Sequence, residues 1–189
     1  MQNLPCVILS GGRSSRMQED KSLLAFKNYN SLIEFQYSKL SKIFSNVYIS
    51  SKVDKFEFLN DKSKIIFDTN NIFSPMIALQ SIFTKLKTKK IFIITVDNPF
   101  ITKETIENLI KSSDNFDITL AQTPQKLHNL CGVFNINILD DINKNIENDM
   151  HKINFMVKNS NFNVVEFFDE DEFLNINTKE DYKLAVSKY

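Results

Sequence analysis

Glycine and arginine are scarce in this chain, and most of the supply lies in one short stretch. The 189 residues include three glycines and two arginines. Two of the glycines are Gly11 and Gly12, and the arginines are Arg13 and Arg16. The sequence contains neither the Gly-x-Gly-x-x-Gly fingerprint of dinucleotide-binding proteins nor the Gly-x-x-x-x-Gly-Lys-Ser/Thr loop of the P-loop proteins. These two familiar classes of phosphate loop are therefore excluded.

Cysteines and long apolar runs are also sparse. Cys6 and Cys131 lie in apolar runs without the Cys/His neighbours of a metal site, so we expect both to be reduced core residues. No apolar run is long enough to span a bilayer and we expect no signal peptide, so the sequence predicts a cytoplasmic protein that does not bind membranes. There are 23 basic and 23 acidic residues, and a net charge of +0 argues against nucleic acid as a partner.

Apolar residues are plentiful, at 42% of the chain with 17 phenylalanines, which is enough for one domain with a substantial core. Their periodicity predicts strands at 6–9, 47–49, 65–67, 91–96, 118–121, 130–134 and 164–167. It predicts helices at 31–44, 54–60, 75–86, 105–110, 136–146 and 151–159, and a last one after Thr178. The alternation over the first two-thirds predicts an α/β fold: a single-domain, mostly parallel, doubly wound (Rossmann-like) sheet flanked by helices.

The first predicted strand leads into the stretch Leu9-Ser10-Gly11-Gly12-Arg13-Ser14-Ser15-Arg16-Met17, which is followed by Asp20-Lys21. Successive backbone N–H groups in a glycine-rich turn form an anion site, and glycine lets a ligand approach them closely. Two arginines and a lysine supply the positive charge that a polyphosphate needs. An ordinary Gly-Gly turn with solvated arginines is the alternative, but the clustering of positive charge after a buried strand favours phosphate binding.

Two aspartates follow other predicted strands. Asp97 comes directly after the predicted strand 91–96, and Asp68 comes directly after the predicted strand 65–67. Ligands of doubly wound sheets bind beyond the carboxyl ends of the strands, so we expect Gly11, Asp68 and Asp97 on one rim. A carboxylate there suits Mg²⁺, which favours a metal-binding Asp97 over a residue that only stabilises a local turn with Asn98-Pro99.

These patterns resemble the nucleotidyltransferases with a Rossmann-like fold, and most of all the molybdenum cofactor guanylyltransferases. The loop from Leu9 to Lys21 is similar to that family's Leu-Ala-Gly-Gly, Arg-Met-Gly and Asp-Lys pattern. Asp97-Asn98-Pro99-Phe100 resembles its Asp-x-Pro-Phe/Tyr motif, and 175–181 resembles its Asn-x-Asn-Thr-Pro-Glu-Asp closure. The chain departs from the family at Gln18, Ser74 and Ala78, where the family has glycine.

The resemblance implies an enzyme that transfers GMP from GTP to molybdopterin and releases pyrophosphate, with Mg²⁺ as cofactor. The terminal phosphate of the pterin is already ionised at neutral pH, so catalysis would consist of positioning and charge neutralisation. The implied nucleotide-binding residues are Leu9, Ser10, Gly11, Gly12, Lys21, Asp68 and Asp97. The implied catalytic residues are Arg16, Lys21 and Asp97, and Asp97 would hold the metal. The implied pterin-binding residues are Asn175 and Asn177. Residues 1–112 would form the nucleotide part of the domain and 113–189 the pterin part. Further partners would be other proteins of molybdenum cofactor biosynthesis or the acceptor molybdoenzymes.

Several alternatives stay open. A related cytidylyltransferase, or a nucleotidyltransferase for a sugar or polyol phosphate, fits the same motifs. A non-catalytic nucleotide-binding homologue fits the lost glycines, although retention of Lys21 and Asp97 argues against it. Asp68 fits a residue that leads into a helix as well as it fits a ligand. His128 and His151 fit surface positions as well as they fit a role at the second substrate.

Overall fold

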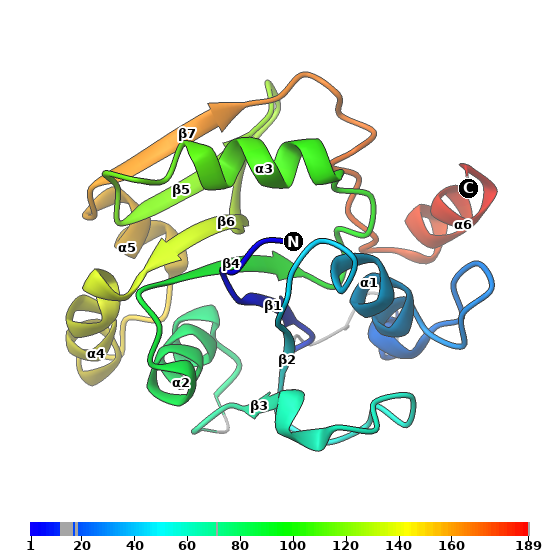
Figure 1. Ribbon diagram of the computed structural model, residues 1–189, viewed down its shortest axis with the longest axis horizontal. Helices are drawn as coiled ribbons and strands as arrows, with labels where there is room; N and C mark the ends of the chain where they lie inside the picture. Colours follow the sequence, from blue (N-terminus) through cyan, green and yellow to red (C-terminus); the bar gives the residue numbers. More distant parts are fainter. Residues whose placement is uncertain (12–16, 18, 71, 189) are drawn as a thin grey trace.

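The computed structural model describes residues 1–11, 17, 19–70 and 72–188, whose strands form a single sheet covered by helices on both faces (Figure 1). The strands are β1 (Cys6–Leu9), β2 (Val47–Ser51), β3 (Ile65–Phe67), β4 (Lys90–Thr95), β5 (Ile118–Gln122), β6 (Leu127–Asn135) and β7 (Phe162–Glu166). The α-helices are α1 (Leu32–Leu40), α2 (Pro75–Leu86), α3 (Lys103–Lys111), α4 (Leu139–Glu147), α5 (Ile153–Lys158) and α6 (Lys179–Lys188). Short 3₁₀ helices are η1 (Lys21–Leu23), η2 (Lys62–Lys64) and η3 (Ile136–Ile138).

The sheet is mostly parallel, as predicted. Its seven strands lie in the order β3-β2-β1-β4-β6-β5-β7. β6 runs antiparallel to its neighbours β4 and β5, and the other pairings are parallel. The α/β class and the doubly wound arrangement expected from the sequence are therefore confirmed.

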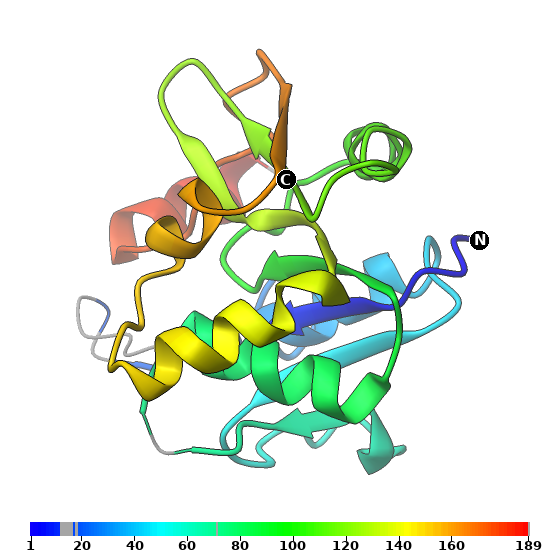
Figure 2. The same ribbon diagram turned by 90° about the vertical axis from the view of Figure 1, so that its left-hand side faces the viewer.

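Alternate side chains of the central strands enter different cores, because successive residues of a strand point to opposite faces. Ile8 and Ile94 pack in one apolar cluster with residues of α1 and α3, whereas Val7 and Ile93 pack in another with residues of α2, α4 and α5. Figure 2 shows α2 and α4 side by side on this second face, where Gln80 of α2 donates a hydrogen bond to Asn143 of α4 at 2.7 Å. Burial on both faces explains why these strands read as continuous apolar runs.

The helix predicted over 54–60 is wrong. The chain forms turns there, and its nearest helical element is η2. The Asp54 carboxylate accepts a hydrogen bond from the Phe56 amide at 3.3 Å, and Lys62 Nζ donates to the Phe56 carbonyl at 3.0 Å. Lys62 thus occupies the Phe56 carbonyl, which in a helix would accept from the Asn60 amide, while Phe56 and Leu59 anchor the turn in the core.

Gly132, the third glycine of the chain, permits β5 and β6 to pair closely. A Cβ atom at this position would lie 2.0 Å from the carbonyl oxygen of Thr119 on β5. The register between the two strands shifts close by, between Leu120 and Ala121. A residue with a side chain would therefore have to push the strands apart at this point.

Candidate active site

The carboxyl ends of the central strands form the rim on which the site is built. Leu9 at the end of β1 lies beside Ser50 of β2 and Thr95 of β4 in the parallel register. Hydrogen bonds continue past the strands, from the Val96 amide to the Leu9 carbonyl at 3.0 Å and from the Asp68 amide to the Ser51 carbonyl at 3.2 Å. The predicted placement on one rim is confirmed, since Gly11 and Asp68 line one cavity there and Asp97 lines the next.

The first cavity has a volume of about 670 Å³. Residues that line it include Leu9, Gly11, Ser50, Lys52, Asp68 and Phe73. Gly11 does not adopt a positive φ, and a Cβ added to it would meet no atom of the described residues within 4 Å. Gly11 therefore contributes open space beside the backbone rather than an unusual conformation, which suits close approach by a ligand.

The far wall of this cavity combines a carboxylate, a cation and an aromatic ring. Ser50 Oγ donates a hydrogen bond to Asp68 Oδ1 at 3.2 Å. Burial raises the pKa of Asp68, against the opposing effects of Ser50 and Lys52. Lys52 Nζ donates to the carbonyls of Asn70 and Ile72 at 3.1 and 2.9 Å and lies 4.2 Å from the centre of the Phe73 ring. Lys52 thereby ties the segment after β3 to the end of β2.

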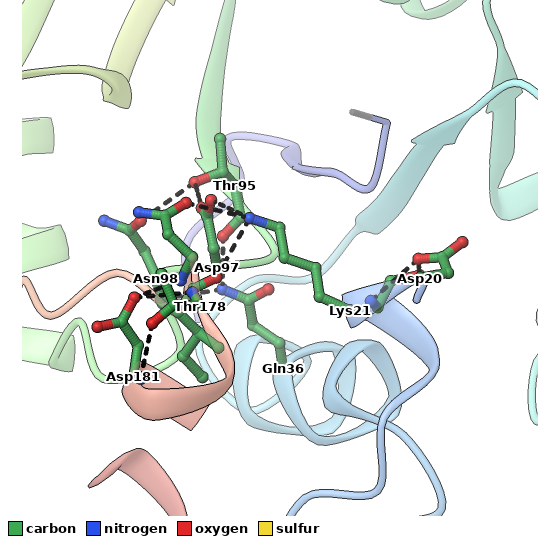
Figure 3. Close-up of polar contacts among 11 residues, drawn as sticks. Asp20, Lys21, Gln36, Thr95, Asp97, Asn98, Thr178 and Asp181 are labelled. Atoms are coloured by element: carbon green, nitrogen blue, oxygen red, sulfur yellow. Dashed lines mark hydrogen bonds and ion pairs between the residues drawn. The ribbon is translucent and has the colours of Figure 1, made fainter. Parts of the chain in front are cut away.

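At the centre of the rim, Lys21 forms an ion pair with Asp97 (Figure 3). The Lys21 Nζ to Asp97 Oδ2 distance is 2.6 Å, and the two side chains are 18% and 15% exposed. Lys21 Nζ also lies 3.3 Å from the Ile176 carbonyl oxygen and 3.5 Å from Asn177 Oδ1. Three predicted site residues, Lys21, Asp97 and Asn177, are therefore brought together from distant parts of the chain.

The orientation of Asp97 depends on residues that the sequence did not single out. Thr95 Oγ1 donates to Asp97 Oδ1, and the Ile176 amide donates to the Asp97 carbonyl at 2.9 Å. Buried Gln36 of α1 donates from Nε2 to the carbonyls of Thr95 and Asn98 at 3.1 and 3.0 Å (Figure 3). Two features of the sequence could have pointed to these residues. Thr95 is a polar residue at the end of a buried strand, and Gln36 is a polar residue on the apolar face of a helix.

Replacing Thr95 with valine should lower the rate of a reaction that depends on Asp97 about 10- to 100-fold, because a hydrogen bond to a charged group contributes about 1.5–3 kcal/mol. The valine side chain has a similar shape but cannot donate a hydrogen bond to Asp97 Oδ1. Steady-state kinetics should show the loss mainly in kcat, and Thr95→Ser should restore most of it. Equal kcat in Thr95→Val and the wild type would show that Asp97 needs no support from this hydroxyl.

A second cavity, of about 310 Å³, adjoins the first, and Thr95 and Leu130 line both. Asp97, Asn175 and His128 also line the second cavity. Asn175 Oδ1 is buried and has no hydrogen-bond partner within the described part of the chain. A buried polar atom without a partner is costly, so this oxygen is suited to accept a hydrogen bond from a ligand.

His128 is not a surface residue. It is 6% exposed, its ring lies 4.6 Å from that of Phe173, and its Nε2 lies 3.3 Å from Thr123 Oγ1. Burial, with a smaller effect of Lys126, lowers its pKa to about 4, so the ring is neutral at pH 7. The other histidine, His151, has its Nε2 3.0 Å from Asp149 Oδ1.

The segment that carries the two asparagines is held by the start of α6. Asp181 Oδ2 accepts hydrogen bonds from the amides of Asn177 and Thr178 at 2.9 and 2.8 Å. Thr178 Oγ1 accepts in return from the Asp181 amide at 3.1 Å, which completes a capping box at the start of the helix that the sequence predicts after Thr178. The asparagines therefore serve different sides of the site: Asn175 lines the second cavity, whereas Asn177 lies beside Lys21.

The oxygen atoms at the centre of the site suit a hard cation that is also bound by oxygen atoms of a substrate. The described residues contain no group of three or more His, Cys, Asp or Glu side chains that could hold a metal by themselves. Asp97, the Ile176 carbonyl and Asn177 present oxygen atoms only, and Mg²⁺ commonly binds to one or two carboxylates together with phosphate oxygens and water. The cysteines are not part of this set: both are buried, and burial raises the pKa of the Cys131 thiol to about 12.

Residues 12–16 and 18 of the predicted phosphate loop, which include Gly12 and Arg16, lie outside the described residues. The roles proposed for Gly12 and Arg16 therefore stay predictions. None of the helices in the described ranges is long and apolar enough to cross a membrane.

Comparison with known proteins places this geometry in context. A family described as "MobA-like NTP transferase domain" matches residues 6–160. The chain is 41% identical to a molybdenum cofactor guanylyltransferase of Campylobacter jejuni (strain RM1221), over 100% of this chain and 98% of that protein. It is 36% identical to a protein of the same name from Helicobacter pylori (strain G27), over 98% and 93% of the two chains. Molybdopterin-guanine dinucleotide biosynthesis protein A from Archaeoglobus fulgidus has the same fold, with a TM-score of 0.80 at 19% identity over 98% of each chain.

Proposed function

The chain belongs to the MobA-like NTP transferase family, and we propose that it transfers GMP from GTP to molybdopterin, which yields the guanine dinucleotide form of the cofactor and pyrophosphate. The observation that carries this proposal is the Lys21–Asp97 pair beside two adjoining cavities of different size: Asp97 lines the smaller one, and its hydrogen-bond partner Thr95 lines both. Such an arrangement suits a reaction that joins two substrates at one phosphorus atom. The larger cavity would take the nucleotide and the smaller one the pterin.

The reaction needs little from the protein beyond placement and charge. An oxygen of the pterin's terminal phosphate forms a bond to the α-phosphorus of GTP, and the bond from that phosphorus to the bridging oxygen breaks with its electron pair leaving on pyrophosphate. Because the attacking phosphate is already ionised, no side chain has to remove a proton. Lys21 would neutralise charge on the phosphates, which is the main requirement of phosphorus transfer. Mg²⁺, when bound by Asp97, would supply further neutralisation and orientation of the phosphate oxygens.

The wall around Asp68 suits a guanine base. Guanine presents two adjacent N–H donors, and a carboxylate can accept both. Ser50 occupies one side of Asp68 Oδ1 and leaves acceptor capacity free on this group. Ile72 and Phe73 line the same cavity and would cover the flat face of the base.

The second cavity suits a pterin with a phosphate. Asn175 Oδ1 would accept from the N–H groups along the pterin edge, and Lys126, which lines the same cavity, would attract the phosphate. Asn177 lies beside Lys21 and is not among the residues that line this cavity, so its contribution to seating the pterin would be at the phosphate end. The proposal keeps the division into a nucleotide part, 1–112, and a pterin part, 113–189, as well as the cytoplasmic location and the further partners expected from the sequence.

Thermal stabilisation by GTP, CTP, ATP and UTP, each with Mg²⁺, tests the choice of nucleotide. A ligand at about 100 times its Kd stabilises the folded state by about 2.7 kcal/mol, which for a chain of this size raises Tm by about 5–10 °C. We expect this shift with GTP alone, and we expect Asp68→Asn to reduce it. A shift with CTP alone would favour the related cytidylyltransferase. No pyrophosphate release from GTP and molybdopterin would contradict the proposed reaction.

A further inference from the structure

The ammonium group of Lys21 has three oxygen partners, which come from two other segments of the chain. Its Nζ lies 2.6 Å from Asp97 Oδ2, 3.3 Å from the Ile176 carbonyl oxygen and 3.5 Å from Asn177 Oδ1. One partner is a carboxylate, one a backbone carbonyl and one a side-chain amide. Figure 3 shows the long Lys21 side chain reaching across from η1 into this cluster.

The cluster is a set of ligands that a hard divalent cation prefers. Mg²⁺ and Mn²⁺ favour carboxylate, carbonyl and water oxygens, and an ammonium group is a compact point charge that competes for the same atoms. Two cations cannot share this small space without strong repulsion. Lys21 in its present position and a divalent metal therefore exclude each other.

We propose that Lys21 is a resident cation: in the nucleotide-free protein it occupies the metal site made by Asp97, Asn177 and the Ile176 carbonyl, and the metal enters only when triphosphate draws Lys21 away. These oxygens would then bind the metal directly or through water. The inference rests on the proposed function for the identity of the triphosphate, and it adds Asn177 and the Ile176 carbonyl to the expected ligand Asp97.

The segments that carry these oxygen atoms are held in place by contacts that do not involve Lys21. Asp97 is fixed by Thr95 Oγ1 and by the hydrogen bond from the Ile176 amide to its carbonyl at 2.9 Å. The Asn177 amide is held by Asp181 at 2.9 Å. Removal of the ammonium group should therefore leave the oxygen cluster in place and accessible to a metal.

The backbone of Lys21 is anchored as well, so that only its side chain has to move. The carboxylate of the preceding residue, Asp20, accepts hydrogen bonds from the Ser22 amide at 3.1 Å and from Ser22 Oγ at 2.6 Å, and it pairs with Lys55. The side chain itself has four rotatable carbon–carbon bonds, so its ammonium group can leave the oxygen cluster while the backbone stays in place. Exchange of Lys21 between the oxygens and a phosphate therefore needs no rearrangement of the fold.

Titration with Mn²⁺ in the absence of nucleotide tests the proposal, with free Mn²⁺ measured by electron paramagnetic resonance. The wild type should bind Mn²⁺ weakly, and Lys21→Met should bind one Mn²⁺ at least about tenfold more tightly, because a like charge has been removed from the site. Adding Asn177→Ala to Lys21→Met should abolish most of this gain. The matched control is Lys62→Met, which removes another lysine–aspartate pair, Lys62–Asp54 at 2.9 Å, and should behave as the wild type.

Circular dichroism and Tm establish that each variant is folded, and Lys21→Gln repeats the test if the methionine variant is not. Equal Mn²⁺ affinity in the wild type and the Lys21 variants would overturn the proposal, and a gain that survives Asn177→Ala would overturn the assignment of Asn177. None of these readouts requires turnover or the pterin. The proposal can therefore fail in a protein that makes the guanine dinucleotide, and it can hold in one that uses another substrate.

Discussion

Asp97→Asn should lower the rate of GMP transfer by about 10²- to 10³-fold, the usual cost of removing one preorganised electrostatic group from a transition state. Asparagine has the same shape and can still accept a hydrogen bond from Thr95, but it has no charge to balance Lys21 or to hold the Mg²⁺ that we propose for this site. Its amide nitrogen would also face the Lys21 ammonium. The variant should therefore lose activity in the chemical step and keep its fold.

Release of pyrophosphate from GTP in the presence of molybdopterin and Mg²⁺ measures this effect, and the Tm of the variant monitors its fold. The control is Asp114→Asn, because Asp114 also pairs with a lysine, Lys90 at 3.3 Å, but its side chain is 86% exposed. Exposed ion pairs contribute little, so this variant should be fully active. Full activity of Asp97→Asn would remove Asp97 from the reaction.

Gly132→Ala should lower the free energy of unfolding by about 3 kcal/mol, which is at the upper end of the usual cost of overpacking. The added Cβ would lie 2.0 Å from the Thr119 carbonyl oxygen and 3.0 Å from Leu120 Cα, and both are backbone atoms of β5 that cannot rotate away. The two strands must therefore separate, which weakens hydrogen bonds in the middle of the sheet. Urea unfolding should show a lower midpoint with an unchanged m-value.

Gly11→Ala is the matched control for this prediction. Its added Cβ would meet no atom within 4 Å in the part of the chain that the structure describes, so the free energy of unfolding should stay near that of the wild type. The same methyl group would project into the open space of the larger cavity, so affinity for GTP should fall. A Gly132→Ala protein as stable as Gly11→Ala would mean that β5 and β6 can adjust without cost.

The elements that were predicted well are those whose residues carry a local signal. The strand predicted over 91–96 is β4, and the helix predicted to begin at Pro75 is α2, with Ser74 as its N-cap. A buried parallel strand needs apolar residues in succession, and a helix start needs a cap, so both can be read within a few residues. The helix expected over 54–60 is wrong, and the Phe56 carbonyl that such a helix would use accepts from Lys62 Nζ instead.

The residues of the site also differ in how well the sequence predicts them. Because the carboxyl ends of parallel strands lie at the same edge of a sheet, Asp68 and Asp97 could be placed together from strand order alone. The supporting residues Thr95 and Gln36 could not, since their importance lies in which backbone and side-chain groups happen to lie opposite them. His128 illustrates the same limit, because its burial against Phe173 depends on a segment that follows it by more than forty residues.

By itself, the sequence determined the class of fold, the rim on which the site lies and the main charged residues, Lys21 and Asp97. These follow from apolar runs, turn residues and motif spacing, which act over a few neighbouring residues. Only the tertiary structure decided that Lys21 lies in an oxygen cluster with Asn177, and that Asn175 faces a second cavity instead. Hydrogen bonds between distant segments set these positions, and their geometry depends on how the whole sheet and its helices pack.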